Sequence, residues 1–229
     1  MTPVSTQNII KGLRSNDPTL IGLYIGVWCG DGTQYYDKGY RVKICCNSNN
    51  LKMIDFIKSV LFELFGKNVL HVAKETRHRS LIRFNSKFIY NFVKQYVKFG
   101  GNKTHTISLK SRVKDYENCF LSGFVLGLTL TDGYLKGRFV FNVTSKRLAQ
   151  NLYEILQLWG LNPKLSVTDR SKYGWQDLVS VRLGVVESNN ILSILDKTLE
   201  ALSSKSSFLE LKYEQNGPAE TFQLQKETF

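Results

Sequence analysis

The chain has 229 residues, 42 % of them hydrophobic, a composition typical of a globular protein with one large domain or two fused small ones. Lys and Arg number 31 against 19 Asp and Glu, so the formal net charge is +12, which favours a polyanionic partner: nucleic acid first and an anionic membrane second. The longest apolar runs, near 20–30 and 120–131, are too short to cross a bilayer and predict buried helices.

The cysteines and histidines point away from disulfide and zinc chemistry. Cys29, Cys45, Cys46 and Cys119 form no CxxC pair, which predicts reduced thiols in an intracellular protein. The three histidines are too scattered for an HxxxH-type metal site. The N-terminal stretch MTPVSTQNIIKGLR has no signal-peptide core, so we expect no secretion.

The N-terminal half predicts five elements in the order helix, hairpin, helix, hairpin, helix. An apolar helix over 20–32 ends in Asp31-Gly32, and an alternating strand follows over 40–47. An amphipathic helix over 50–66 closes with a glycine. Strands over 69–76 and 79–85 and a helix over 86–97 complete the half.

The second half repeats that order. LSGFVLGLTLTDG (121–133) matches LIGLYIGVWCGDG (20–32), and GRFVFNVTSKRL (137–148) matches YRVKICCNSNNL (40–51). A helix over 147–160, strands in 164–170 and 177–184 and a helix over 188–202 follow. We therefore expect an α+β protein with an N-terminal half at 1–98, a linker at 99–117, a C-terminal half at 118–202 and a tail at 203–229.

Small residues recur every four positions in both apolar helices, at Gly22, Gly26 and Gly30 and at Gly123, Gly127 and Thr131. A glycine inside a helix costs about 1 kcal/mol relative to alanine, so two matching stripes predict helices that pack backbone to backbone at a pseudo-twofold axis. Their C-terminal ends then lie side by side and bring Asp31 and Asp132 together.

Two neighbouring carboxylates remain ionised only when a cation compensates their repulsion. Helix C-termini add free carbonyls and the negative end of the dipole. Oxygen ligands with no His or Cys point to Mg²⁺, and a basic protein with such a site suits metal-assisted phosphodiester hydrolysis. Taken singly, each Asp-Gly pair is also a common turn signal.

The motifs YIGVWCGDG (24–32) and VLGLTLTDG (125–133) resemble those of LAGLIDADG homing endonucleases, and the resemblance covers about residues 18 to 202. Two motifs in one chain are similar to the monomeric, pseudo-symmetric branch of that family. The resemblance implies two αββαββα units, each with a four-stranded antiparallel sheet that forms half of a DNA-binding saddle. It also implies cleavage of both strands across the minor groove to leave 3′ overhangs.

By the same resemblance, Asp31 and Asp132 are metal ligands together with the carbonyls of Gly30 and Thr131. Mg²⁺ is the implied cofactor, with Mn²⁺ as a substitute and Ca²⁺ as an ion that binds without cleavage. The family often has Gln or Lys at the end of its first long strand, where this chain has Cys46 and Asn47, then Val143 and Thr144. The residues expected to polarise water are Lys87, Gln34 and Lys136, each lysine being alternatively a phosphate contact.

The outward residues of the strands and hairpin tips form the expected DNA-binding surface. Arg, Asn and Gln on strands pair with base edges in the major groove, whereas Lys at tips takes phosphates. The alternative is a solvated polar sheet face. The expected contacts are Tyr35, Tyr36, Arg41, Lys43, Cys45, Asn47, Lys74, Arg77, His78, Arg79, Arg83, Lys136, Arg138, Val140, Asn142, Thr144, Arg170, Lys172, Tyr173, Trp175, Ser180 and Arg182.

The leading hypothesis is therefore a monomeric, intron-encoded, site-specific endonuclease that binds a long asymmetric double-stranded DNA site. We expect no membrane and no obligatory protein partner, and a location in the nucleoid or cytoplasm of a prokaryote or in an organelle matrix. The rival is a relative that no longer cleaves and acts as an intron maturase on RNA or as a DNA-binding regulator. A structural or membrane-surface protein fits the charge but leaves the paired Asp-Gly helices unexplained.

Overall fold

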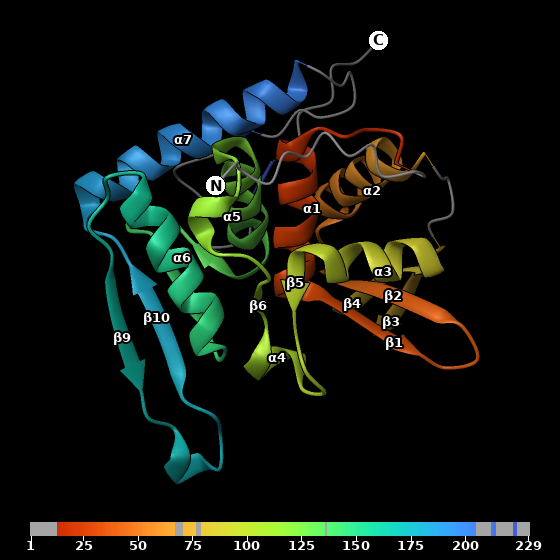
Figure 1. Ribbon diagram of the computed structural model, residues 1–229, viewed down its shortest axis with the longest axis horizontal. Helices are drawn as coiled ribbons and strands as arrows, with labels where there is room; N and C mark the ends of the chain where they lie inside the picture. Colours follow the sequence, from red (N-terminus) through yellow and green to blue (C-terminus); the bar gives the residue numbers. More distant parts are fainter. Residues whose placement is uncertain are drawn as a thin grey trace.

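The structure, a computed structural model, describes residues 13–66, 71–76, 79–135, 137–204, 212–213 and 222–223, with the backbone alone at 71–75, 212–213 and 222–223. Two halves lie on either side of a central pair of helices, α1 (Pro18–Asp31) and α5 (Asn118–Asp132) (Figure 1). Among the described residues, every helix is too short or too polar to cross a membrane.

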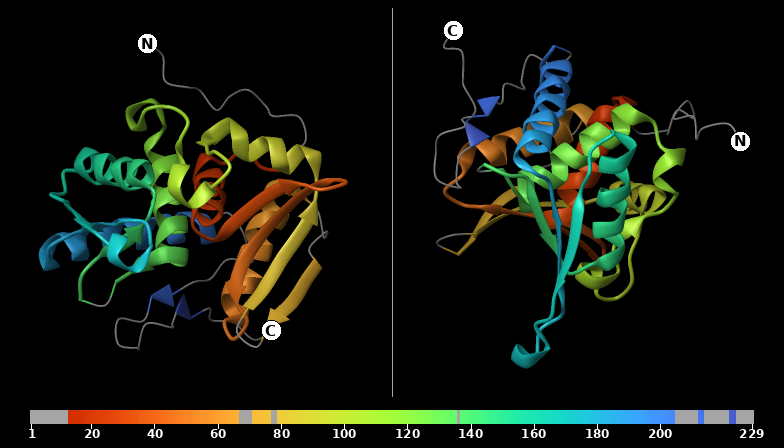
Figure 2. Two further views of the ribbon diagram at one scale, coloured as in Figure 1. Left: turned by 90° about the horizontal axis from the view of Figure 1, so that it is seen from below. Right: turned by 90° about the vertical axis from the view of Figure 1, so that its left-hand side faces the viewer.

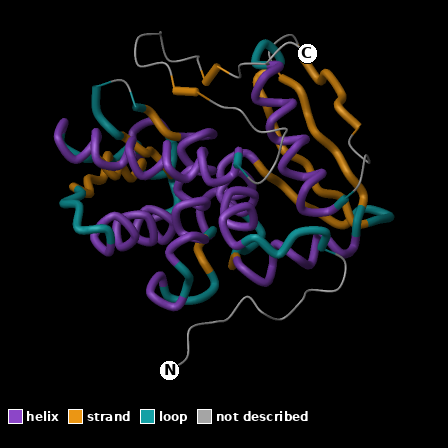
Figure 3. The backbone as a smooth tube through the Cα atoms, turned by 90° about the horizontal axis from the view of Figure 1, so that it is seen from above, coloured by secondary structure: helices purple, strands orange, loops and turns teal. Residues whose placement is uncertain are grey.

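The N-terminal half has a four-stranded antiparallel sheet in the order β1-β2-β4-β3. Seen from above, helices cover these strands (Figure 3). After α1, the elements are β1 (Gly32–Tyr36), β2 (Tyr40–Asn47), α2 (Leu51–Phe65), β3 (His71–Thr76), β4 (Arg79–Asn85) and α3 (Lys87–Tyr96).

The C-terminal half repeats this arrangement with the sheet order β7-β8-β10-β9, again antiparallel. The predicted αββαββα fold class is thereby confirmed, although β7 and β8 are shorter than their counterparts. After α5, the elements are β7 (Gly133–Tyr134), β8 (Val140–Val143), α6 (Lys146–Leu158), β9 (Lys164–Thr168), the short 3₁₀ helix η2 (Ser171–Tyr173), β10 (Leu178–Arg182) and α7 (Val185–Ser203).

Regular structure also occupies the segment expected as a linker. This segment contains α4 (Lys103–Thr106), β6 (Ser108–Leu109) and the 3₁₀ helix η1 (Val113–Asp115). The strand β5 (Val97–Lys98) comes just before it and pairs with β6. Two short paired strands, β11 (Lys212–Tyr213) and β12 (Phe222–Gln223), lie in the tail. The chain between the halves is thus folded against them, which matters for the site below.

Strand alternation places one face of each sheet in the core, as predicted. Val42, Ile44 and Cys46 of β2 are buried, as are Phe139 just before β8 and Phe141 within it. Because side chains alternate along a strand, the residues between them face away from the covering helices. Each sheet therefore has one helix-covered face and one outer face.

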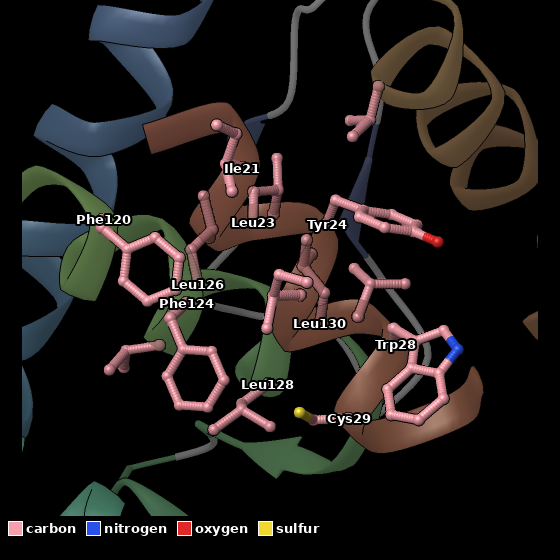
Figure 4. Close-up of a cluster of buried hydrophobic side chains, with 14 of the residues drawn as sticks. Ile21, Leu23, Tyr24, Trp28, Cys29, Phe120, Phe124, Leu126, Leu128 and Leu130 are labelled. Carbon is pink, nitrogen blue, oxygen red and sulfur yellow. The ribbon is translucent and has the colours of Figure 1, made fainter. Parts of the chain in front are cut away.

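The glycine stripes lie where α1 and α5 cross, as predicted. A Cβ on Gly26 would lie 2.9 Å from the Leu128 nitrogen and closer to the Phe124 carbonyl oxygen. A Cβ on Gly127 would meet the backbone of Leu23, Val27 and Gly26. Large apolar side chains from both helices surround this contact and exclude water from it (Figure 4).

Candidate metal centre and nucleic-acid interface

The close packing of α1 and α5 brings their C-terminal ends together. Both helices end at the acid of the motif, and the next residue opens the first strand of its half. The Asp132 Oδ2 lies 3.1 Å from the position that a Cβ on Gly30 would occupy. The glycine at this position therefore leaves room for the carboxylate of the opposite helix.

The electrostatics of Asp31 and Asp132 show an acid pair in a poorly hydrated place. Burial, followed by the charge of Asp132, raises the pKa of Asp31 to about 6, while Lys103 and Arg79 oppose the shift. Burial also raises the pKa of Asp132, and Lys103 opposes it. The positive charge of the protein thus compensates the pair only in part.

Lys103 reaches this site from the segment between the halves, and no sequence pattern had indicated it as a site residue. Its Nζ donates to the carbonyl oxygens of Trp28 at 2.7 Å, Gly30 at 3.2 Å and Gly32. The ammonium group also lies 4.7 Å from the centre of the Trp28 ring. A cation at these carbonyls complements the negative end of the helix dipole.

Lys103 is half-buried. Burial lowers the pKa of its amine, whereas the charges of Cys29, Asp132 and Asp31 act to raise it. Figure 1 places α4 between the two halves, below the ends of α1 and α5. The sequence gives little indication that Lys103 belongs to the site, because KTHT (103–106) has no equivalent stretch in the second repeat and resembles an ordinary polar connection.

Neutral thiols complete the neighbourhood of the acids. Burial raises the pKa of Cys29 to about 12 and, together with the charge of Asp31, that of Cys46 to about 12 as well. Both are therefore neutral thiols at neutral pH in the protein without metal. Within the described residues, no group of three or more His, Cys, Asp and Glu side chains gathers at any one place.

The donors present fit an oxygen-coordinated divalent cation bound by two carboxylates and helix-end carbonyls. The raised pKa values support this fit, since a divalent ion between the acids would relieve their repulsion and their desolvation. The Gly30 carbonyl already accepts a hydrogen bond from Lys103, so one of its lone pairs is engaged. The Thr131 hydroxyl turns back to its own helix and donates to the carbonyls of Gly127 and Leu128.

Two of the three residues expected to polarise water contact groups other than the acids. The Gln34 amide donates to the Tyr90 carbonyl of α3 at 3.0 Å, because Gln34 pairs with buried Val42 and shares its helix-covered face. The Lys87 Nζ lies 5.7 Å from the ring of Tyr40, at the hairpin end of β2. Tyr40 pairs with Tyr36, which lies four residues along β1 from Gly32, or about 13 Å at ~3.3 Å per residue.

The direction of α3 explains the position of Lys87. The N-terminus of α3 begins at the far end of the sheet, and its C-terminal end returns the chain towards the central helices. The lysine that reaches the acids therefore follows α3 instead of opening it. The third expected residue, Lys136, lies outside the described residues.

The outer face of the N-terminal sheet gathers the predicted nucleic-acid contacts. Lys43 Nζ lies 4.8 Å from the centre of the Tyr35 ring, and Arg79 Nε lies 2.9 Å from Cys45 Sγ. Tyr36 is exposed at the hairpin tip. The strand pairing brings Tyr35, Arg41, Lys43, Cys45, Asn47, Arg79 and Arg83 onto this face. Arg77, His78 and the side chain of Lys74 lie outside the described residues.

The outer face of the C-terminal sheet is less charged. Ser180 is buried and donates to the Asn142 amide oxygen at 2.6 Å, so that hydroxyl is already engaged. Thr144 is engaged too: its hydroxyl donates to the Thr104 carbonyl at 2.7 Å and lies 3.2 Å from His105 Nδ1. The other expected residues, Arg138, Val140, Arg170, Lys172, Tyr173, Trp175 and Arg182, are exposed or half-buried.

Several solved structures have the same fold as this chain. Mesophilic variants of the homing endonuclease I-DmoI superpose with a TM-score of 0.61 at 19 % identity, over 79 % of this chain and 97 % of that chain. I-DmoI in complex with DNA and Mn gives 0.60 at 18 % identity, over 78 % and 97 %. No protein-family model matches the chain, and no curated protein matches it either.

A second protein shares the fold. The N-terminal LAGLIDADG domain of DUF199/WhiA superposes with a TM-score of 0.51 at 14 % identity, over 83 % of this chain and 86 % of that chain. These similarities confirm that the chain has the LAGLIDADG fold, as the resemblance of its motifs implied. At such identities they establish the fold alone.

Proposed function

We propose that this protein is a divalent-metal-dependent DNA endonuclease that binds a long asymmetric double-stranded site and hydrolyses one phosphodiester in each strand, leaving 3′ overhangs. The observation that carries the proposal is the acid pair, Asp31 and Asp132, at the joined ends of two helices and between two sheets with polar outer faces. The fold is shared with I-DmoI, a homing endonuclease whose structures include complexes with DNA and Mn or Ca.

The proposed chemistry assigns a role to each group at the centre. Bound Mg²⁺, with Mn²⁺ as a substitute, would activate water and stabilise the leaving oxygen. Asp31 and Asp132 hold the metal, with the carbonyls of Gly30 and Thr131 as further oxygen donors. Lys103 fixes the end of α1 and offsets part of the acid charge, so we assign it as a positioning residue. Arg79, whose charge acts on Asp31, faces the nucleic-acid side.

The two outer sheet faces bind the DNA in this proposal. Their outward side chains differ between the halves, so the bound site is asymmetric. The strand length fits this role, because eight residues of β2 at ~3.3 Å each span about 26 Å, comparable to eight base pairs. The described protein is proposed to act as a monomer, since one chain supplies both acids.

A relative that binds without cleaving is the second candidate, as an intron maturase or a DNA-binding regulator. The fold is shared with I-DmoI and with the LAGLIDADG domain of WhiA, and a shared fold does not by itself establish an activity. The retained acid at both helix ends favours cleavage, because loss of either acid disables one half of the centre. The observation for the second candidate is that a neutral thiol, that of Cys46, lies within electrostatic reach of Asp31.

The test replaces each acid by its amide. Asp31→Asn and Asp132→Asn should each abolish double-strand cleavage in Mg²⁺, while affinity for DNA measured in Ca²⁺ stays within a few-fold of the parent. Leu158→Ala, an exposed apolar position on α6, is the matched control and should cut normally. Cleavage retained by either acid variant would refute the assignment of the metal centre.

A further inference from the structure

The hairpin of β9 and β10 ends in two exposed aromatic side chains. It extends beyond the helices of its half, and η2 forms its tip (Figures 1 and 2). Tyr173 and Trp175 at this tip are 61 % and 63 % exposed. Aromatic side chains with so much surface in water, far from the core, are unusual unless they contact a partner.

The tip is held in shape by its own hydrogen bonds. The Ser171 amide donates to the Asp169 carboxylate at 2.7 Å, and the Trp175 amide donates to the Arg170 carbonyl. The Arg170 Nε donates to the Gln176 carbonyl at 3.0 Å, which ties the two sides of the loop together. Because these bonds order the backbone of the loop, a ligand that binds here does not have to order it.

A cationic side chain lies over each of the two rings. The Arg170 guanidinium lies 5.4 Å from the centre of the Trp175 ring, and the Lys172 ammonium lies 4.9 Å from that of Tyr173. The two ring centres are 5.8 Å apart with the planes tilted by 44°. The surface thus offers flat aromatic area and positive charge within one turn of chain.

The nearby acids cancel this charge only in part. Asp177 pairs with Lys146 at 3.1 Å, and Asp169, which accepts from the Ser171 amide, remains ionised, so the two cations Arg170 and Lys172 exceed it by one charge. A ligand that suits the tip has a flat aromatic group next to anionic groups. A nucleobase joined to its phosphates has this combination, because bases stack on aromatic rings while Arg and Lys neutralise the backbone.

The difference between the halves supports the same ligand. The outer face of the N-terminal sheet holds four cationic side chains, of Arg41, Lys43, Arg79 and Arg83. At the corresponding face of the C-terminal sheet, β8 and the centre of β10 offer neutral side chains, and the cations Lys164 and Arg182 pair at the other end of the hairpin from its tip. In the C-terminal half, Arg170 and Lys172 therefore add two cations at the hairpin tip to those at its base.

We propose that Tyr173 and Trp175 form a stacking platform for a nucleobase that has left the duplex stack, with Arg170 and Lys172 on the adjoining phosphates. This inference rests on the proposed function only in taking nucleic acid as the partner. The base comes either from a DNA duplex opened at the outer end of the bound site or from a single strand. Apolar wedges that open base steps are known in proteins that bend DNA.

The test uses Trp175 as its own reporter in EDTA, without metal or cleavage. The chain has three tryptophans, Trp28 is fully buried, and Trp159→Phe removes the other partly exposed indole. The probes are a mixed-sequence duplex, a single-stranded oligothymidine of about 20 nucleotides, and an abasic strand of equal length and charge. We expect the oligothymidine to quench Trp175 and the abasic strand to leave its emission unchanged.

Affinity for labelled oligothymidine separates stacking from simple apolar contact. Trp175→Leu should bind about 5- to 150-fold more weakly than the parent, whereas Trp175→Tyr should stay near the parent value. Leu158→Ala is the exposed control and should bind as the parent does. Equal quenching by abasic and base-bearing strands, or equal affinity of the Leu and Tyr variants, would overturn the proposal.

The remaining outcomes identify the source of the base. Quenching by oligothymidine alone assigns the platform to single strands, and quenching by the duplex as well shows that duplex DNA opens at the tip. If neither quenches Trp175, the platform is refuted even where the protein still cleaves DNA. Conversely, loss of the proposed cleavage activity leaves these metal-free measurements unaffected.

Discussion

The substitution Gly26→Ala tests the backbone-to-backbone contact of α1 with α5. In an isolated helix this change stabilises by about 1 kcal/mol. Here the added Cβ would meet the Phe124 carbonyl, lie 2.9 Å from the Leu128 nitrogen and lie 3.0 Å from the Gly127 Cα. All three atoms are backbone and cannot rotate away, so the helices must move apart.

The expected magnitude follows from these opposing effects. Overpacking in a well-packed core costs about 1–3 kcal/mol and sometimes more, and the absence of a movable neighbour favours the upper end. After the gain in helix propensity, we expect a net loss of about 2 kcal/mol. For a chain of this size, that corresponds to a thermal midpoint lower by about 4–8 °C.

The assay is thermal unfolding followed by circular dichroism, with Gly39→Ala as the control. A Cβ at Gly39 meets no atom within 4 Å, so that variant should stay within about 0.5 kcal/mol of the parent. A Gly26→Ala protein as stable as the parent, or more stable, would show that the two helices do not meet at this point.

Three further predictions concern the centre and the segment that reaches it. Lys103→Met removes the charged donor at the end of α1 and should cost about 1–3 kcal/mol in urea unfolding, an unchanged midpoint being the contrary result. Because the folded protein raises the pKa of Asp31 to about 6, the stabilisation from this group without metal is full below pH ~4 and is lost as the pH rises through about 6. Asp31→Asn should remove this pH-dependent loss of stability, and the same slope of stability against pH in both proteins would contradict the assignment. Ser145→Ala, which loses both the cap of α6 and a bond to the Ile107 carbonyl at 2.6 Å, should destabilise more than Ser86→Ala, which loses a cap alone; equal losses in thermal unfolding would show that the linker bond contributes nothing.

Much of the fold could be predicted from the sequence because the chain contains two copies of one unit. A single GxxxG-like stripe is ambiguous, but the stripes at Gly22 and Gly123 match in position, and each meets the other helix in the structure. Strand alternation likewise identified the buried faces at Val42 and Phe141. Hydrophobic periodicity and an internal repeat can both be recognised in the sequence without knowledge of long-range contacts.

The residues around the acids could not be predicted in the same way. Lys103 has no counterpart in the repeat and reaches the centre only because the segment after α3 folds back between the halves. Lys87 was favoured by its place at a helix start, and the direction of α3 carries it away. Thr144 was expected to face DNA, but Thr104 and His105 engage its hydroxyl. All three depend on long-range packing, which single-sequence patterns do not contain.

The most direct measurement of the central claim is the incubation of the protein with a randomised double-stranded DNA library in Mg²⁺, followed by sequencing of the cut ends. The account predicts cleavage at one long asymmetric sequence with 3′ overhangs, absent when Ca²⁺ replaces Mg²⁺ and absent in Asp31→Asn. Specific binding to a sequence in Ca²⁺ with no cut ends in Mg²⁺ or Mn²⁺ would contradict it.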